Sequence, residues 1–466
     1  MAYTGRRVIY TDESVITREN VVSVLKNAVD VHDANKIEID YLYKYYKGDQ
    51  PILGRVKDVR PEICNKIIVN RANEIVSFKT GYLMGEPVQY VARGEDESII
   101  DKINILNDYM YSENKASKDM SLATWFYICG TAFRMVLPDP SNDVDDAPFE
   151  IYTLDPRNTF VVYQNALGNK PMMGVTFVEK ENGDRTYSVY TNNEYFEIEN
   201  EKIINEESHI LGAIPIIEYP CNDARLGAFE VVLTMLDAIN NVQSNRVDGI
   251  EQFIQALMVF KGVDIDSDSF TQLRAAGAIK IPETADVEYL IQELNQTQTQ
   301  TITDDMYQTV LTICGMPSQS DGSGSDSSNN GAVIVRNGWQ QAEARAMDSE
   351  RIFKEAERNF LKIVIGICND LRGTNFKISN VDIRFTRRNY ENILQKSQVL
   401  ISMLSNNKIA PQLAFSHCGL FVDPDLAWAM SEKYAKEQEQ KAMELAQAQS
   451  VNTEEDTEED VTDNEQ

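Results

Sequence analysis

The sequence of 466 residues has few histidines, few cysteines and no long apolar run, and each shortage excludes a class of protein. Its three histidines lie far apart, and none stands in the HExxH or GxSxG pattern of zinc peptidases and serine hydrolases. The six cysteines include no CxxC pair, so they fit neither a zinc site nor a disulfide framework. We therefore expect no metal, no cofactor and a reducing compartment.

Segments that could enter or cross a membrane are missing from the sequence. No window approaches the ~20 apolar residues that a helix needs to span a bilayer. The N-terminus, MAYTGRRVIYTDESV, lacks an apolar core of signal-peptide length. We expect a soluble protein that has no membrane partner and is not exported by a classical signal.

Positive charge is scarce. The 44 Lys and Arg residues against 73 Asp and Glu give a formal net charge of −29, which argues against ordinary groove binding to nucleic acid. Part of the acidic excess lies in the tail TEEDTEEDVTDNEQ, a like-charge block that is expected to be disordered. The apolar content of 42% still suffices for two or three packed regions.

The first half of the chain combines helical and β-like patterns. Helical spacing is expected over three stretches, about Glu13–Tyr46, Asn65–Gly85 and Glu97–Ile128. Short β-like runs, separated by turn residues such as Asn182 and Gly183, follow from Thr131 onwards. They predict a β-rich region of meander type.

The second half is mainly helical. A proline-free stretch over residues 227–260 predicts one long helix, and an insert with strand-like ends separates it from a second helix, about Gln296–Cys314. Apolar residues on one stripe predict a longer helix over about Ala332–Arg372. A short strand, Val381–Asn389, and helices near Ile393–Leu404, Pro411–Cys418 and Pro424–Ala448 follow. The fold class predicted is α+β, mainly helical.

The run SQSDGSGSDSSNNGA, residues 318–332, interrupts the helical pattern, and three interpretations compete for it. It could be a phosphate-cradling loop, a linker between domains, or a mobile loop that a larger assembly points at a ligand. A P-loop requires GxxxxGK[ST], and this run lacks the lysine and the hydroxyl that follows it. Nucleotide binding and catalysis are therefore not expected here.

Several segments, taken in order, resemble the portal proteins of tailed bacteriophages, specifically the SPP1-like portal family. The cluster Tyr43, Tyr46, Gly48 and Ile52 comes first. The others are NKIIVN (Asn65–Asn70), GYLMGEPVQY (Gly81–Tyr90), CGTAF (Cys129–Phe133), YTLDPRNTFVVY (Tyr152–Tyr163), GAIPIIEYPCN (Gly212–Asn222) and LDAINNVQSNRVDGIEQ (Leu236–Gln252). The resemblance spans most of residues 40–430. One departure is the stretch TRRNYENI after Phe385, which lacks an expected proline.

The resemblance implies a phage portal fold with wing, stem, clip and crown regions. It divides the chain into residues 1–226 (N-terminal part of the wing), 227–260 (stem helix), 261–293 (clip), 294–315 (stem helix), 316–331 (tunnel loop), 332–389 (long wing helix and strand), 390–448 (crown helices) and 449–466 (disordered acidic tail).

The function implied by the resemblance is that of a non-catalytic ring of about twelve subunits at a capsid vertex. Double-stranded DNA would pass through it during packaging and ejection, in transient, sequence-independent contact. The ring would serve as a docking platform for terminase, which hydrolyses ATP, and for head-completion or adaptor proteins. Scaffolding and major capsid proteins are further partners. The location implied is the virion, and the bacterial host cytoplasm during assembly.

The resemblance also assigns candidate site residues. Neutral polar side chains of the tunnel loop can touch phosphates without holding them, and we expect these to face DNA: Gln319, Ser320, Ser323, Ser325, Asn329 and Asn330. Basic positions in the clip are candidates for docking the motor: Lys261, Arg274 and Lys280.

Two alternatives to a portal remain. A monomeric acidic adaptor or scaffold protein would use the Gly/Ser run as a plain linker, and its oligomeric state would distinguish it. An enzyme of unrecognised type comes third, and a metal or nucleotide bound to the purified protein would favour it.

Overall fold

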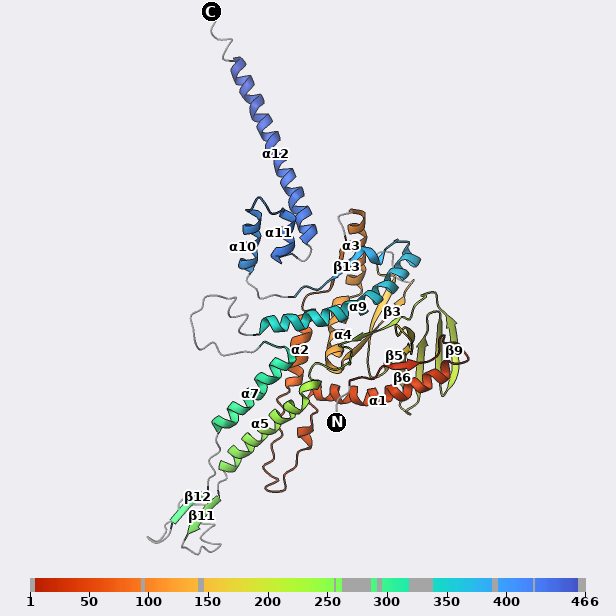
Figure 1. Ribbon diagram of the computed structural model, residues 1–466, viewed down its shortest axis with the longest axis vertical. Coiled ribbons are helices and arrows are strands. Elements are labelled where there is room, and N and C mark those ends of the chain that lie inside the picture. Colours follow the sequence, from red (N-terminus) through yellow and green to blue (C-terminus); the bar gives the residue numbers. More distant parts are fainter. Residues whose placement is uncertain are drawn as a thin grey trace, which may run out of the picture.

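The computed structural model describes residues 5–93, 97–140, 146–254, 257–261, 286–290, 296–317, 338–387, 393–421 and 424–459. Figure 1 shows a central body with a projection at each end. Helices α5 (Leu233–Ile254) and α7 (Gln296–Cys314) extend from one end, and α12 (Pro424–Glu459) extends from the other. The fold class is α+β and mainly helical, as predicted.

A six-stranded sheet with α1 (Val21–Lys47) packed on it forms one side of the body. In spatial order its strands are β1 (Ile9–Thr11), β5 (Thr159–Gln164), β6 (Pro171–Glu179), β7 (Arg185–Tyr190), β8 (Glu194–Glu199) and β9 (Lys202–Ser208). The β1–β5 pair is parallel and the other pairs are antiparallel. Val21, Leu25 and Ala28 of α1 share a buried cluster with Phe160 and Val175.

The first helix is shorter than predicted. It begins at Val21 rather than near Glu13. The Thr17 amide donates to the Asn20 side chain at 2.8 Å, and that side chain donates to the Val15 carbonyl at 3.0 Å. These bonds hold a turn in which residues 15–20 are not helical, because the asparagine side chain competes for the backbone groups.

The second sheet divides the predicted meander into two parts. Strands β3 (Thr131–Pro138), β4 (Phe149–Leu154) and β10 (Ile216–Pro220) form an antiparallel sheet in the order β10-β3-β4. Long helix α9 (Trp339–Arg372) packs against it, and the ring of Phe353 lies 4.7 Å from that of Tyr219. The strand positions agree with the alternating patterns of the sequence.

Three further helices complete the body: α2 (Arg71–Met84), α3 (Glu97–Ser112) and α4 (Lys115–Cys129). The stretch predicted as a single helix over Glu97–Ile128 is broken at Asn114, whose φ of 49° lies in the left-handed region. The helix predicted from Asn65 begins only at Arg71, because Asn70 is also left-handed and caps it by accepting the Asn73 amide.

Smaller elements connect these layers. Strand β2 (Gln89–Ala92) pairs antiparallel with β13 (Val381–Arg384). Short 3₁₀ turns cover Pro51–Gly54 (η1), Glu230–Val232 (η2) and Ile378–Asn380 (η3). Helices α10 (Ile393–Leu404) and α11 (Pro411–Cys418) precede α12 and match their predicted bounds. Among the residues that the structure describes, no helix is both long and apolar enough to cross a membrane.

Other predicted bounds also need correction. Helix α9 begins at Trp339 rather than near Ala332, and strand β13 ends at Arg384 rather than at Asn389. The helix expected over residues 227–260 is α5, which covers only Leu233–Ile254. The apolar segment Leu257–Lys261, which contains Val259 and Phe260, instead forms strand β11 and pairs with β12 (Asp286–Leu290). The tail expected to be disordered from residue 449 continues α12 as far as Glu459. Glutamate and glutamine have high helix propensity, so the helix extends into the acidic block.

Candidate functional site

Helices α5 and α7 form an antiparallel pair whose base is anchored in the body. Leu236 and Ile239 of α5 and Val310 and Leu311 of α7 are buried in the main core. Farther out, the Arg246 guanidinium donates to the Gln300 side chain at 2.7 Å. Only one end of the pair is therefore built into the core, and the rest projects beyond it (Figure 1).

Neutral and acidic side chains cover the outer surface of this pair. Helix α7 contains no lysine or arginine, and the only one in α5 is Arg246, which also contacts Gln243. The exposed positions are Thr234, Asn241, Asn245, Ile250 and Gln252 of α5, and Thr297, Gln298, Gln300, Thr301, Ile302, Asp304, Asp305, Gln308, Thr309, Thr312 and Ile313 of α7. A polyanion passing this surface would meet hydrogen-bonding groups but few charges that attract it.

A buried stripe of polar side chains on α5 binds the chain segment that precedes α2. Each of three side chains accepts one backbone N–H: Asn240 from Val69 at 2.9 Å, Ser244 from Ile67 at 2.9 Å and Asp248 from Asn65 at 2.7 Å. Four helical residues rise about 6 Å and two extended residues about 6.6 Å, so the two repeats stay in register. We call this arrangement the polar ladder.

Asp248 is the charged rung of the polar ladder. Its carboxylate lies 2.9 Å from Arg55 Nη1 and 3.0 Å from Lys57 Nζ, and it also accepts the Asn65 side-chain amide at 2.9 Å. Burial acts to raise the pKa of Asp248, but the hydrogen bonds from Asn65 and Lys57 and the charge of Arg55 outweigh it and lower the pKa to about 2. The segment is thus fixed to α5 by a charge as well as by neutral hydrogen bonds.

The start of the Gly/Ser run is fixed where α7 ends. Gly315 has a φ of 64°, and its amide and that of Met316 bond the Thr312 and Leu311 carbonyls in a Schellman motif. A Cβ at Gly315 would lie 2.5 Å from Cγ of Arg345 in α9. The chain therefore leaves α7 in contact with the body.

The described chain resumes at Gly338, near the same place. Gly338 has a φ of 78°, and the ring of Trp339 then packs on those of Phe78 and Tyr82 in α2, at 6.1 and 6.0 Å. The Gln341 side chain donates to the Thr312 carbonyl at 3.3 Å. The described chain on both sides of residues 318–337 thus lies beside the junction of α2, α7 and α9.

Lys261 is the one predicted site residue among those that the structure describes. The loop candidates Gln319, Ser320, Ser323, Ser325, Asn329 and Asn330, and the clip candidates Arg274 and Lys280, lie outside the described residues. Lys261 is the last residue of β11, opposite Asp286 of β12. The sequence interpretation missed the polar ladder, although the spacing of four between its side chains on α5 was visible.

A second buried polar arrangement holds α9 against the body, and we call it the ionic cluster. Four charged side chains form it: Lys115 and Asp119 of α4, Arg134 of β3 and Glu357 of α9. Two tyrosine hydroxyls complete it by donating to the Glu357 carboxylate, Tyr90 at 2.5 Å and Tyr219 at 2.8 Å. Burial acts to raise the pKa of Glu357, but the charges of Lys115 and Arg134 and the Tyr90 bond bring it below its usual range.

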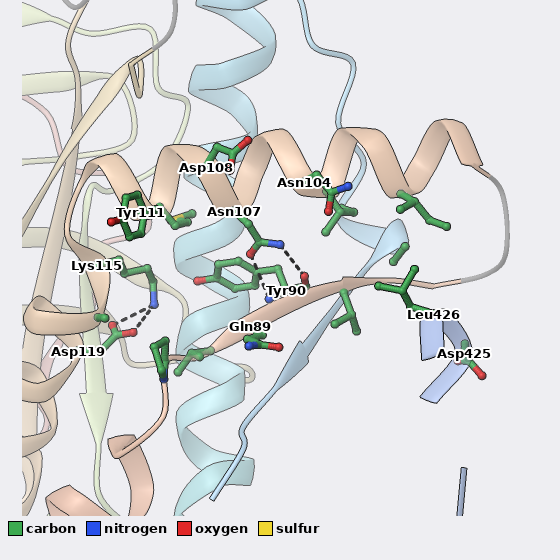
Figure 2. Close-up of a pocket in the computed structure, with 18 of the residues that line it drawn as sticks. Gln89, Tyr90, Asn104, Asn107, Asp108, Tyr111, Lys115, Asp119, Asp425 and Leu426 are labelled. Carbon is green, nitrogen blue, oxygen red and sulfur yellow. Dashed lines mark hydrogen bonds and ion pairs between the residues drawn. The ribbon is translucent and has the colours of Figure 1, made fainter. Parts of the chain in front are cut away.

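Lys115 and Asp119 of the ionic cluster line the inner end of a cavity of about 610 Å³ between β2, α3 and the start of α12. Figure 2 shows Lys115 and Asp119 there, with Asn104, Asn107 and Tyr111 along α3 and Leu426 at the far side. The Asn107 side chain donates to the backbone carbonyl of Tyr90 at 2.9 Å. Lys115, Asp119 and Asn107 thus join neighbouring elements, which favours a structural role for this end of the cavity.

The chain thus has a mainly helical α+β fold with a projecting pair of helices (Figure 1). A comparison with family models identifies the family. The family model described as phage portal protein, SPP1 Gp6-like, matches residues 25–446. The chain belongs to this family, which confirms the resemblance found in the sequence. It is therefore a phage portal protein by family.

Solved structures of low sequence identity are also similar. The neck of an empty GTA particle computed with C6 symmetry has a TM-score of 0.44 and 11% identity, over 75% of this chain and 90% of that chain. The neck of a native GTA particle computed with C12 symmetry gives 0.41 and 11%, over 75% and 89%. The virion of a native gene transfer agent particle gives 0.41 and 10%, over 82% and 94%. No curated protein matches the chain significantly.

Proposed function

We propose that about twelve copies of the chain form a closed ring at a capsid vertex and that double-stranded DNA passes through it. In this proposal α5 and α7 are the stem helices around the channel, and the region of β11 and β12 is the clip outside the head. The N-terminal half and α9 form the wing, and α10, α11 and α12 form the crown. Membership of the portal family supports this arrangement.

One observation carries the proposal, the scarcity of positive charge on the α5–α7 pair. Each ion pair that DNA formed with a channel wall would have to be broken again as the duplex moved. Helix α7 has no lysine or arginine, and its exposed side chains are mainly threonine, glutamine and aspartate. Such a surface suits a conduit better than a binding site.

The Gly/Ser run is proposed to be the tunnel loop. The described residues on either side of it, Gly315 and Gly338, lie where the base of the α5–α7 pair meets the body. Its neutral side chains can hydrogen-bond to phosphates without forming ion pairs. We propose that the six loop candidates Gln319, Ser320, Ser323, Ser325, Asn329 and Asn330 contact DNA.

The force for packaging is proposed to come from other proteins. We infer that this chain is not an enzyme and that a separate terminase hydrolyses ATP and docks on the clip, where Lys261, Arg274 and Lys280 are candidate contacts. Head-completion, scaffolding and major capsid proteins are the other expected partners. Assembly would take place in the bacterial host cytoplasm, and the ring would remain in the virion.

The loop proposal is tested by adding charge. A variant with Ser323→Lys, Ser325→Lys and Asn329→Lys should package DNA several-fold more slowly, because each lysine can hold a phosphate. The matched control places glutamine at the same three positions, which changes size without charge. Packaged DNA per particle is the readout. Unchanged packaging by the lysine variant would show that these residues do not face DNA.

A further inference from the structure

The α5–α7 pair has two different flanks. The polar ladder fixes the segment Leu53–Val69 to one side of α5, and α7 packs on another side. Figure 1 shows α5 between α7 and the segment that follows α1. A ring built from identical copies needs head-to-tail contacts, in which one surface of a copy meets a different surface of the next. Two unlike flanks fulfil this requirement.

The first flank is the segment Leu53–Val69, whose exposed surface combines apolar side chains with a lysine. Leu53 is 42% exposed and Ile67 36% exposed, although both are large apolar side chains. Lys66 lies between them, since its ammonium group donates to the Leu53 carbonyl at 2.7 Å. Val56 and Val59 extend the exposed apolar surface along the same segment. Apolar side chains held in fixed positions around a lysine are typical of a contact surface.

The second flank is a stripe of exposed side chains on α7, and its charge is negative, opposite to that of Lys66. Ile302 and Ile313 are 52% and 44% exposed, and Asp305 and Thr309 lie between them at the spacing of one helix face. Asp305 is exposed as well, and α7 has no cation to offset it. This stripe therefore offers apolar side chains and a carboxylate.

The two flanks also lie at the same height along the pair. Arg246 of α5 contacts Gln300 of α7, and the helices run in opposite directions. Because the helices are antiparallel, a step of two residues from Arg246 to Ser244 and a step of two residues from Gln300 to Ile302 lead in the same direction. Ser244 is therefore about level with Ile302. Ser244 holds the Ile67 amide, so Ile67 and Ile302 are level on opposite flanks. Neighbouring copies related by rotation about a ring axis could bring these side chains together.

We propose that the Leu53–Val69 segment of one copy packs on the α7 stripe of the next copy. Leu53 and Ile67 would cover Ile302, and Lys66 would pair with the Asp305 carboxylate. This inference rests on the proposed ring. Each copy carries a net charge of −29 and repels its neighbours, so a lysine facing an aspartate offsets part of that repulsion where the copies meet.

Disulfide cross-linking tests the contact directly. Ile67→Cys combined with Ile302→Cys, in a chain with Cys64→Ser, should give a ladder of covalent oligomers after oxidation, up to the closed ring. The matched control combines Ile67→Cys with Asn241→Cys, because Asn241 is exposed on α5 and belongs to neither flank. Rings that form normally but yield no more cross-linked product from the Ile302 pair than from the control would overturn the contact.

Charge exchange gives an independent readout. Lys66→Glu or Asp305→Lys should each raise the subunit concentration needed for half-assembly about fivefold, as expected for one lost ion pair. The double variant should recover most of this loss. Lys170→Glu, an exposed change elsewhere, controls for net charge. Absence of recovery in the double variant would contradict the pairing. Failure of the unaltered chain to form rings would instead refute the proposed function on which the contact rests.

Discussion

At the scale of single residues, Glu357 joins three layers of the molecule through one carboxylate. It comes from α9 and contacts Lys115 of α4, Arg134 of β3 and Tyr219 of β10. None of its side-chain surface is exposed. A buried charge is tolerated only where opposite charges and hydrogen bonds compensate it, and the ionic cluster has two charges of each sign. The position of α9 on the sheet thus depends on this residue.

Glu357→Gln should therefore be strongly destabilising. It would leave Lys115 and Arg134 with only Asp119 as a counter-charge, and the free energy of unfolding should fall by about 3–5 kcal/mol. Urea unfolding of the unassembled chain measures this change. Glu355→Gln, an exposed change two residues away on α9, should stay within about 0.5 kcal/mol. Equal stability of the two variants would show that the charge of Glu357 does not stabilise the folded protein by compensating Lys115 and Arg134.

Asp248 predicts a pH dependence. Its pKa in the folded protein, about 2, is below the usual value of about 3.9, so the folded state favours the ionised form. The stability that it contributes is complete above about pH 4 and is lost as the pH falls towards 2. The difference in unfolding free energy between the wild type and Asp248→Asn should therefore shrink over this window, from about 1.5–3 kcal/mol at pH 7.

The control for Asp248 is a neighbouring carboxylate without these contacts. Asp58→Asn removes an exposed charge from the segment that Asp248 holds and should cost little at pH 7. Limited proteolysis adds a local readout, because loss of the ladder should expose the segment around Arg60 to cleavage. A pH-independent effect of Asp248→Asn would rule out the assigned role of its charge.

At the scale of elements, sequence patterns located the helices that have local stop signals. The bounds of α10 and α11 agree with the prediction, and α9 ends at Gly373 as expected. Gly373 stops α9, and Pro411 and Gly419 stand at the two ends of α11, so these signals are local. The break at Asn114, which takes a left-handed conformation, was not predicted, because the helical pattern of the sequence continues through it.

The polar ladder and the ionic cluster could not be predicted from the sequence, because their partners are distant along the chain. The sequence shows that Asn240, Ser244 and Asp248 lie on one helix face, but it does not show which segment they bind. Their partners lie more than 170 residues away along the chain. The two segments had each entered the family resemblance, as NKIIVN and LDAINNVQSNRVDGIEQ, and the structure brings them into contact.

The junction between α7 and the Gly/Ser run gives a prediction at this scale. Gly315→Ala should lower the free energy of unfolding by about 1–3 kcal/mol, because a Cβ strains a left-handed residue and would lie 2.5 Å from Arg345 Cγ. Gly212→Ala is the control, since Gly212 has a φ of 61° but open space around it. Thermal unfolding should show a larger loss for Gly315→Ala. Equal losses would mean that the close approach to α9 contributes nothing.

At the scale of the whole molecule, charge and shape fit a subunit that functions in an assembly. The α5–α7 pair projects from one end of the body and α12 from the other, so both carry much exposed surface for their size (Figure 1). Leu426, Met430 and Tyr434 of α12 are exposed large apolar side chains at a spacing of four. An isolated copy therefore leaves apolar surface in water that contact with other copies could cover.

The central claim is that this chain forms a ring with a channel, and its oligomeric state tests that claim most directly. Light-scattering mass should be measured together with negative-stain electron microscopy on the purified full chain. The account predicts particles of about twelve times the chain mass of 52.8 kDa, with a central hole about as wide as a DNA duplex. A chain that stays monomeric over a range of salt and magnesium concentrations would contradict it and favour a monomeric adaptor.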